Sequence, residues 1–149
     1  MDEATQAVAD ALDLCHQKAI DAFRRRDLRE YMALFTAELS YRQSSGKVIG
    51  RDQLANNMAA QLSTLHSAES SFVREELVVS GDEATEQLKQ ITTLTTRHFR
   101  VFYRTWMMER QGRYVWVRTD QGWCIRQVEV LHESATPGSV SLSQPPDLV

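Results

Sequence analysis

Glu129 is the carboxylate whose position best suits acid–base chemistry. It lies near the C-terminal end of the chain, in a segment where apolar and polar residues alternate as in a β-strand. Because strand side chains alternate between two faces, every second residue points the same way. The residues on this face are Trp123, Ile125, Gln127, Glu129 and Leu131. If the face is interior, Glu129 lies at a pocket, where burial raises the pKa of an isolated carboxyl as a general acid requires.

The competing role for Glu129 is an ion pair with an arginine of a neighbouring strand, Arg113 or Arg118. An arginine within reach would keep the carboxylate ionised and would leave it structural. If Glu129 does transfer protons, Tyr41 or His16 could assist it.

The histidines give no sign of a metal site. His16, His66, His98 and His132 show none of the spacings by which histidine, cysteine and carboxylate residues bind metals. We therefore expect no metal and no cofactor. His16 and His98 could each act as a base, but neither has a partner fixed by spacing, which favours a structural or surface role.

Five aromatic residues could line a cavity for a small apolar or aromatic ligand, with phenol and indole groups to orient it. They are Tyr41, Tyr103, Trp106, Tyr114 and Trp116. The same residues could instead form a core or a dimer interface. One alternating set combines residue types typical of interfaces: Arg104, Trp106, Met108 and Arg110. This favours a homodimer that forms through a face of the sheet.

The N-terminal half predicts three helices. Residues 4–26 carry apolar side chains at intervals of three and four, and arginines end this helix. Asp27 and Glu30 then form a cap for a short second helix that reaches Phe35. A short strand is expected over Glu38 to Arg42, followed by a small hairpin or an irregular rim. The third helix follows Gly50 and ends before the polar residues 66–71.

Everything after residue 72 predicts antiparallel strands. Turns are expected at Gly81–Asp82 and at 120–122, and Gly112 marks a possible bulge in the long segment 99–118. Helices followed by antiparallel strands predict one α+β domain over 1–133. All three prolines lie in residues 134–149, which predicts a flexible tail there.

Composition excludes several classes of protein. With 149 residues, of which 42% are hydrophobic, the chain can bury a core without disulfides. No apolar run is long enough to cross a membrane, and the first residues lack a basic region followed by an apolar stretch. We therefore expect a cytoplasmic protein that does not contact membranes.

Charge is unevenly distributed along the chain. Residues 97–126 contain seven arginines and two carboxylates. This excess could bind anions or nucleic acid, but no stacking-aromatic or glycine-rich RNA motif accompanies it. We interpret the arginines as the solvated face of strands and do not expect a nucleic-acid partner.

Three stretches carry a family resemblance: FRRRDLREYMALFTAELSY (23–41), GKVIGRDQL (46–54) and GRYVWVRTDQGWCIRQVEV (112–130). Their order and spacing resemble the nuclear transport factor two-like superfamily, which includes SnoaL-like and ketosteroid isomerase-like proteins. The resemblance implies a cone-shaped α+β fold, in which three N-terminal helices pack on a curved antiparallel or mixed sheet. It also implies a pocket between helices and sheet, and dimers formed through the outer face of the sheet.

The resemblance does not fix the chemistry. Ketosteroid isomerase-like members use a carboxylate on the strand after the second helix and a tyrosine of the first helix. Here Ser40 to Ser45 contain no carboxylate, and the first helix contains no tyrosine. Epoxide hydrolase-like members use an Asp-Arg-Asp arrangement, whereas Asp82 and Asp120 fall in turns. The resemblance to the SnoaL-like members and to the association-domain members of the superfamily therefore remains open.

Three functions follow as hypotheses. The first is a protein that binds a small molecule in its pocket without catalysis. The second is a cofactor-independent lyase, isomerase or cyclase with Glu129 as the acid or base. The third is a homo-oligomeric assembly domain whose own side chains close the pocket.

Overall fold

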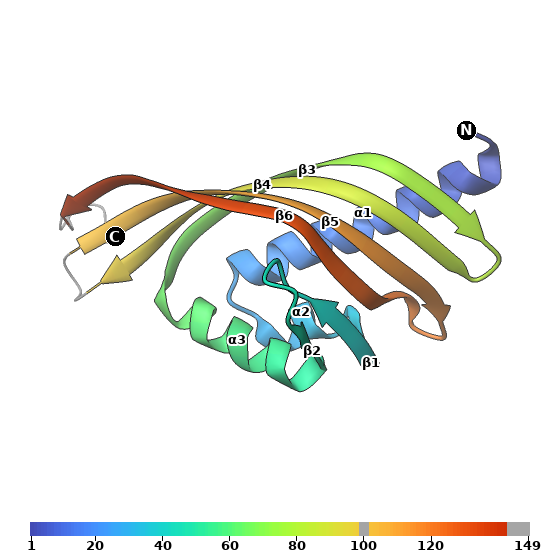
Figure 1. Cartoon of the computed structure of the whole chain (residues 1–149), viewed down its shortest axis with the longest axis horizontal. Coiled ribbons are helices and arrows are strands. Elements are labelled where there is room, and N and C mark those ends of the chain that lie inside the picture. The colour runs from blue at the N-terminus through green and yellow to red at the C-terminus, as the bar shows by residue number, and fades with distance from the viewer. Residues whose placement is uncertain (99–101, 143–149) are drawn as a thin grey trace.

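The computed structural model describes residues 1–98 and 102–142, and its helices precede most of its sheet (Figure 1). The helices are α1 (Glu3–Arg24), α2 (Leu28–Met32) and α3 (Arg51–Thr64). The side chain of Asp2 caps α1 by accepting a hydrogen bond from the backbone of Thr5, at 2.7 Å. Asp27 caps α2 in the same way through Glu30. None of the described helices is long and apolar enough to span a membrane.

Six strands form one mixed sheet. They are β1 (Phe35–Arg42), β2 (Val48–Ile49), β3 (Leu65–Ser80), β4 (Glu83–His98), β5 (Phe102–Thr119) and β6 (Gly122–Leu142). Their order across the sheet is β2-β1-β6-β5-β4-β3. Among the described strands, β1 and β6 alone pair in parallel, and the other neighbours are antiparallel. This is the α+β class with three N-terminal helices that we predicted.

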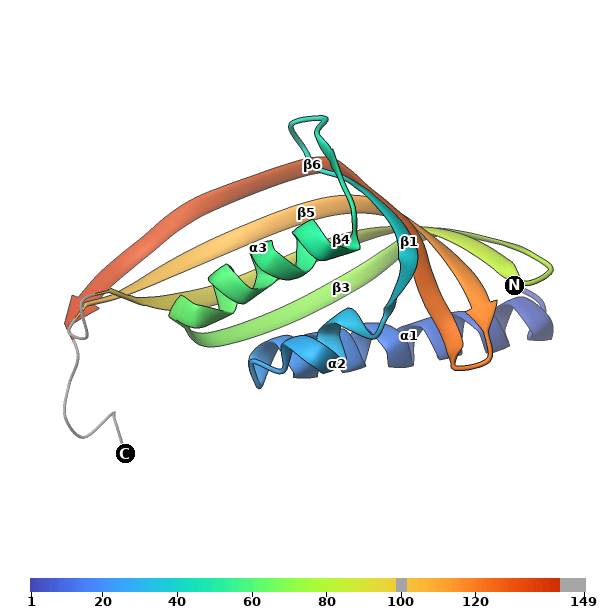
Figure 2. The same cartoon turned by 90° about the horizontal axis from the view of Figure 1, so that it is seen from below.

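The sheet is curved, and the helices lie on its concave side (Figure 2). The largest group of buried apolar side chains fills the space between α1, β1 and the middle of the sheet, with Leu12 and Trp116 fully buried. A smaller group around Leu62 and Leu94 joins the end of α3 to β3 and β4. Between these two groups the helices and the sheet enclose the cavity described below.

The start of β3 and the end of β6 differ from our prediction. β3 begins at Leu65, directly after α3, so residues 66–71 form strand rather than a polar connection. β6 continues past residue 133 to Leu142 and pairs with β5 up to Phe102. Residues 134–142, which we expected in a flexible tail, therefore belong to the sheet. Residues 99–101 and 143–149, which include the expected strand start at Phe99 and the end of the tail, lie outside the described residues.

Three register shifts interrupt the pairing of β6 with β5, one of them between Arg104 and Trp106, and such shifts change the faces of the side chains in β6. Ile125 pairs with Trp116, but Gln127 pairs with Val115, so Arg126 is an extra residue. A second shift, opposite Gly112, leaves Leu131 of β6 as an extra residue, so the bulge that we expected within the segment 99–118 lies in its partner strand instead. After the first bulge, the inward positions move from odd to even numbers.

Candidate functional site

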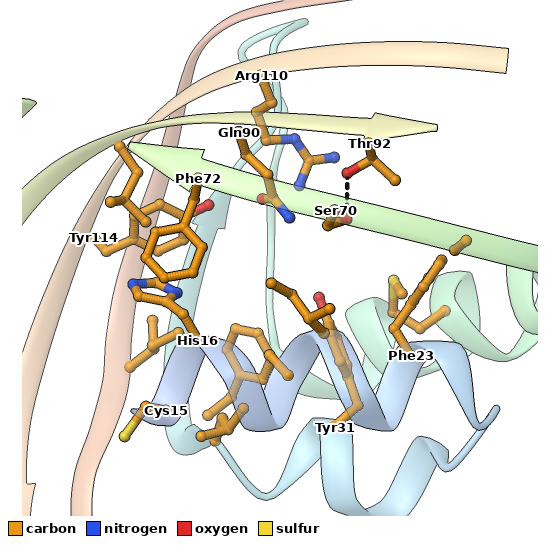
Figure 3. A pocket seen from close by; sticks show the side chains of 18 of the residues that line it. Cys15, His16, Phe23, Tyr31, Ser70, Phe72, Gln90, Thr92, Arg110 and Tyr114 are labelled. Carbon is orange, nitrogen blue, oxygen red and sulfur yellow. Dashed lines mark hydrogen bonds between the residues drawn. The ribbon is translucent and has the colours of Figure 1, made fainter. Parts of the chain in front are cut away.

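The cavity has a volume of about 150 Å³ and lies between α1, α2, α3 and the concave face of the sheet (Figure 3). Its walls are largely aliphatic and aromatic, with residues such as Phe23, Phe72 and Leu88. Polar side chains enter from the sheet, and among them Ser70 and Thr92 hydrogen-bond to each other at 2.7 Å. The cavity therefore suits a small, mostly apolar molecule with a few polar atoms.

His16 is the titratable base in the cavity wall. It projects from α1 toward the sheet, where its ring lies 5.0 Å from that of Phe72 and 5.2 Å from that of Trp116. Its side chain is 12% exposed. Its Nε2 contacts Oε1 of Glu86, a carboxylate of β4 that is not exposed and is not among the residues that line the cavity. The two residues form a histidine–carboxylate pair across 70 positions of sequence.

Glu86 is held as an anion by several donors. The indole Nε1 of Trp116 donates to its Oε1 at 2.9 Å, and Nε of Arg74 donates to its Oε2 at 2.9 Å. Burial by itself raises the pKa of a carboxyl, but the hydrogen bonds and charges of His16 and Arg74 lower the pKa of Glu86 below its ordinary value. An ionised carboxylate can only accept hydrogen bonds, so Nε2 of His16 carries the hydrogen.

This assignment determines which atom of His16 can act. In the neutral imidazole, a hydrogen on Nε2 leaves the lone pair on Nδ1. Among the described residues, none hydrogen-bonds to Nδ1. His16 can therefore accept a proton at Nδ1, and the resulting imidazolium is stabilised by the carboxylate of Glu86.

A second polar group lies at the sheet side of the cavity, around Arg110 of β5. Nη1 of Arg110 donates to the hydroxyl of Tyr41 at 3.2 Å, and its Nε and Nη2 each lie 2.8 Å from Oε2 of Glu133. The phenols of Tyr31 and Tyr114 also line the cavity. Burial raises the pKa of Tyr114 to about 12, although Arg110 opposes this rise, and burial raises the pKa of Tyr31 further. Both phenols are therefore neutral donors at pH 7.

The charge of Arg110 is already balanced by Glu133. Burial would lower the pKa of Arg110, but the surrounding tyrosines and Glu133 raise the pKa above its ordinary value, so the guanidinium stays protonated. A balanced cation surrounded by phenols is a hydrogen-bond donor group rather than a site for a permanent anion. It suits a carbonyl or phenol oxygen that gains charge during a reaction.

The structure divides the predicted aromatic set. Tyr41, Tyr114 and Trp116 line the cavity. Tyr103 is buried elsewhere, with its ring 4.5 Å from that of His66, and Trp106 lies under the guanidinium of Arg104 at 4.6 Å. Tyr103 and Trp106 are therefore not among the residues that line the cavity, contrary to our expectation, because β5 meets the cavity only from Met108 to Trp116.

Gln127 and Glu129 also lie away from the cavity, contrary to our prediction. The bulge at Arg126 turns both side chains outward, while Val128 and Val130 are buried. Nη1 of Arg113 donates to Oε1 of Glu129 at 3.2 Å. Glu129 therefore forms the cross-strand ion pair that was the competing interpretation, and the geometry gives it no contact with the cavity.

Sequence reasoning missed Glu86 and Arg74, and it also missed Tyr31 and the place of Arg110 at the cavity. A signal for Glu86 was available, because strand alternation places it on the buried face with Ala84 and Leu88. Arg74 shows a weaker signal of the same kind, because it alternates with Ser70 and Phe72 on the less exposed face of β3. Among the described residues, no three histidine, cysteine or acidic side chains lie close enough together to hold a metal ion.

Comparison with known proteins agrees with this architecture. The model of the SnoaL-like domain matches residues 16–123. The chain belongs to the SnoaL-like domain family. Its fold is that of the nuclear transport factor two-like superfamily, as the resemblance implied.

Solved structures of this SnoaL-like protein's fold have low sequence identity to it. A conserved protein from Planctomyces limnophilus is 15% identical, with a TM-score of 0.75 over 89% of this chain and 99% of that one. A ketosteroid isomerase-like protein from Erwinia carotovora atroseptica is 18% identical, with a TM-score of 0.64 over 97% and 100%. A hexachlorocyclohexane dehydrochlorinase is 11% identical, with a TM-score of 0.63 over 94% and 91%. A search of curated proteins found no match.

Proposed function

We propose that this SnoaL-like protein is a cofactor-independent enzyme in which His16 removes a proton from a carbon atom of a small, largely apolar substrate. The observation that carries the proposal is the imidazole in the cavity wall with a fully buried carboxylate behind it. A base positioned in this way contributes about 10²- to 10⁴-fold to the rate of a proton transfer. His16 thereby replaces Glu129 as the base.

The polar group around Arg110 can stabilise the negative charge that the substrate gains during the reaction. When Nδ1 of His16 takes the proton, the electron pair of the broken C–H bond moves toward the substrate's oxygen or expels a leaving group from the adjacent carbon. The phenols of Tyr31 and Tyr114 and the guanidinium of Arg110 can donate to that oxygen as it gains charge. Return of the proton to another carbon gives isomerisation, and loss of the leaving group gives elimination.

Two structural neighbours have names that fit this chemistry. A dehydrochlorinase removes hydrogen and chlorine from its substrate, and a ketosteroid isomerase-like protein is named for an isomerisation. At 11% and 18% identity these likenesses show fold alone, so they support the proposal only as compatible precedents.

The proposal can be tested with 5-nitrobenzisoxazole, a flat aromatic compound that any suitably placed base opens. The base removes the proton on C3, the N–O bond breaks, and a coloured nitrile phenolate forms. We expect the wild-type protein to accelerate this reaction and His16→Gln to lose about 100-fold in kcat/KM. Glu129→Gln is the matched control and should keep the full rate. An unchanged rate in His16→Gln would refute the proposal.

The alternative is binding of a small molecule without turnover, which the mostly apolar walls favour. It predicts that 5-nitrobenzisoxazole binds, as seen by quenching of tryptophan fluorescence, while no variant or wild-type protein accelerates its ring opening.

A further inference from the structure

Arg74 connects the histidine–carboxylate pair to a third charged residue. Its Nε lies 2.9 Å from Oε2 of Glu86, the carboxylate oxygen that His16 does not contact. Its Nη2 lies 2.6 Å from Oδ1 of Asp13, which precedes His16 by one turn of α1. The side chain of Arg74 is 16% exposed, whereas that of Asp13 is 47% exposed. Arg74 is thus held between two carboxylates, one inside the protein and one at its surface.

We propose that Arg74 is a positioning residue that sets the pH range in which His16 can accept a proton, by competing with the imidazole for the charge of Glu86. This inference rests on the proposed role of His16 as a base. Arg74 is not among the residues that line the cavity, so it acts through Glu86.

The physical reason is the balance of charges around the ring. A buried carboxylate beside an imidazole favours the imidazolium, which cannot act as a base. A guanidinium on the other oxygen of the same carboxylate opposes a second positive charge, and so favours the neutral ring. Asp13 weakens this opposition, but its larger exposure reduces its effect through solvent screening.

Every element that packs against His16 contributes to this balance. The charged and titratable groups on these elements are Asp13 and Cys15 from α1, Arg74 from β3, Glu86 from β4, Tyr114 from β5 and, elsewhere in the cavity lining, Tyr31, Tyr41 and Arg110. Burial raises the pKa of both the Cys15 thiol and the Tyr114 phenol, so these two are neutral near pH 7. Arg110 is paired with Glu133. Arg74 is therefore the cation that bears most directly on the pair.

The test follows the ring signals of His16 by NMR as a function of pH, in the full-length protein. In Arg74→Met the midpoint of this titration should move upward by about one pH unit. In Asp13→Asn it should move downward by a smaller amount, because a negative charge is removed. Arg113→Met removes the same charge as Arg74→Met from the outer face of the sheet, and should leave the midpoint in place.

Turnover of 5-nitrobenzisoxazole supplies the second readout. The pH–rate profile of Arg74→Met should shift to higher pH with its upper plateau retained, since His16 is intact. A lower plateau with no shift would mean that Arg74 only holds α1 on the sheet, where its Nη2 also lies 3.5 Å from the carbonyl of Ala9, and would overturn the inference. If Arg74→Met does not fold, an unmoved midpoint in Asp13→Asn would overturn it equally.

The two proposals can fail separately. Loss of rate in His16→Gln with an unmoved midpoint in Arg74→Met would refute the role of Arg74 alone. A shifted midpoint together with an unaffected rate in His16→Gln would support the electrostatic role and would refute catalysis by His16.

Discussion

At the scale of single residues, the site depends on one buried charge. Glu86 receives hydrogen bonds from a tryptophan and an arginine and contacts His16, and it has no exposure to solvent. An unpaired carboxylate in this position would be strongly unfavourable, so the burial of Glu86 depends on these hydrogen-bond partners. The same arrangement that keeps Glu86 stable also orients the imidazole of His16 toward the cavity.

Glu86 should make stability depend on acid. Its folded pKa lies below its ordinary value of 4.5. The folded state therefore gains stability from the ionised carboxylate above that value, and this gain is lost as pH falls through the folded pKa. We expect Glu86→Gln to be less stable than wild type at pH 7 by about 1–3 kcal/mol. The difference should shrink below pH 4.5.

Chemical denaturation of both proteins at several pH values between 3 and 7 gives their free energies of unfolding, and the difference between the two proteins can be compared across this range. The control is Glu129→Gln, whose carboxylate is partly exposed. A constant difference between wild type and Glu86→Gln across the pH range would contradict the prediction.

At the scale of elements, β6 decides which residues meet the helices. Its bulge at Arg126 lets the strand bend while its two ends keep their apolar side chains inside. Trp123 and Ile125 are buried before the bulge, and Val128 and Val130 after it. Without the extra residue, the same strand would turn Glu129 inward and two valines outward.

Paired substitutions test the bulge. Val128 is 1% exposed, so Val128→Ala should lower the free energy of unfolding by about 2 kcal/mol, through lost burial and a small cavity. The neighbouring Gln127 is exposed, and Gln127→Ala should change stability by less than about 0.5 kcal/mol. Thermal or denaturant unfolding measures both. A regular strand without the bulge would give the reverse order.

At the scale of the whole molecule, one face of the sheet carries the helices and the cavity, and the other is uncovered within the described residues. The uncovered face includes exposed apolar side chains, Ile91 and Met107 among them, alongside charged pairs such as Lys89 with Glu109. Homodimerisation through this face stays a prediction, because exposed apolar residues on a sheet are compatible with a protein interface. Two of the residues from which the sequence predicted it, Met108 and Arg110, line the cavity on the other face instead.

Sedimentation equilibrium can test the dimer. If two copies pair through this face, Ile91→Glu and Met107→Glu should weaken the dimer by about 10-fold or more in Kd, because each places an unpaired charge in the interface. Val48→Glu changes a similarly exposed residue of β2 and should not alter the mass. A wild-type protein that sediments as a monomer at all concentrations would rule the dimer out.

The sequence by itself determined the order and type of most elements and their family, although not the extent of β3 and β6. Helical spacing and capping residues located the three helices, glycine turns located the hairpins, and three motifs identified the superfamily, because these signals are local. The sequence also brought Tyr41, Tyr114 and Trp116 into consideration as ligand contacts, and all three line the cavity.

The tertiary structure alone decided which titratable groups meet. His16 and Glu86 are 70 positions apart, and only the packing of α1 across β3 and β4 brings them into contact. Our prediction placed Glu129 on the wrong face because one extra residue, Arg126, reverses the alternation of β6. The local sequence contains no signal for this bulge. Periodicity fixes side-chain faces only while pairing stays regular, whereas the chemistry of this site depends on contacts between elements.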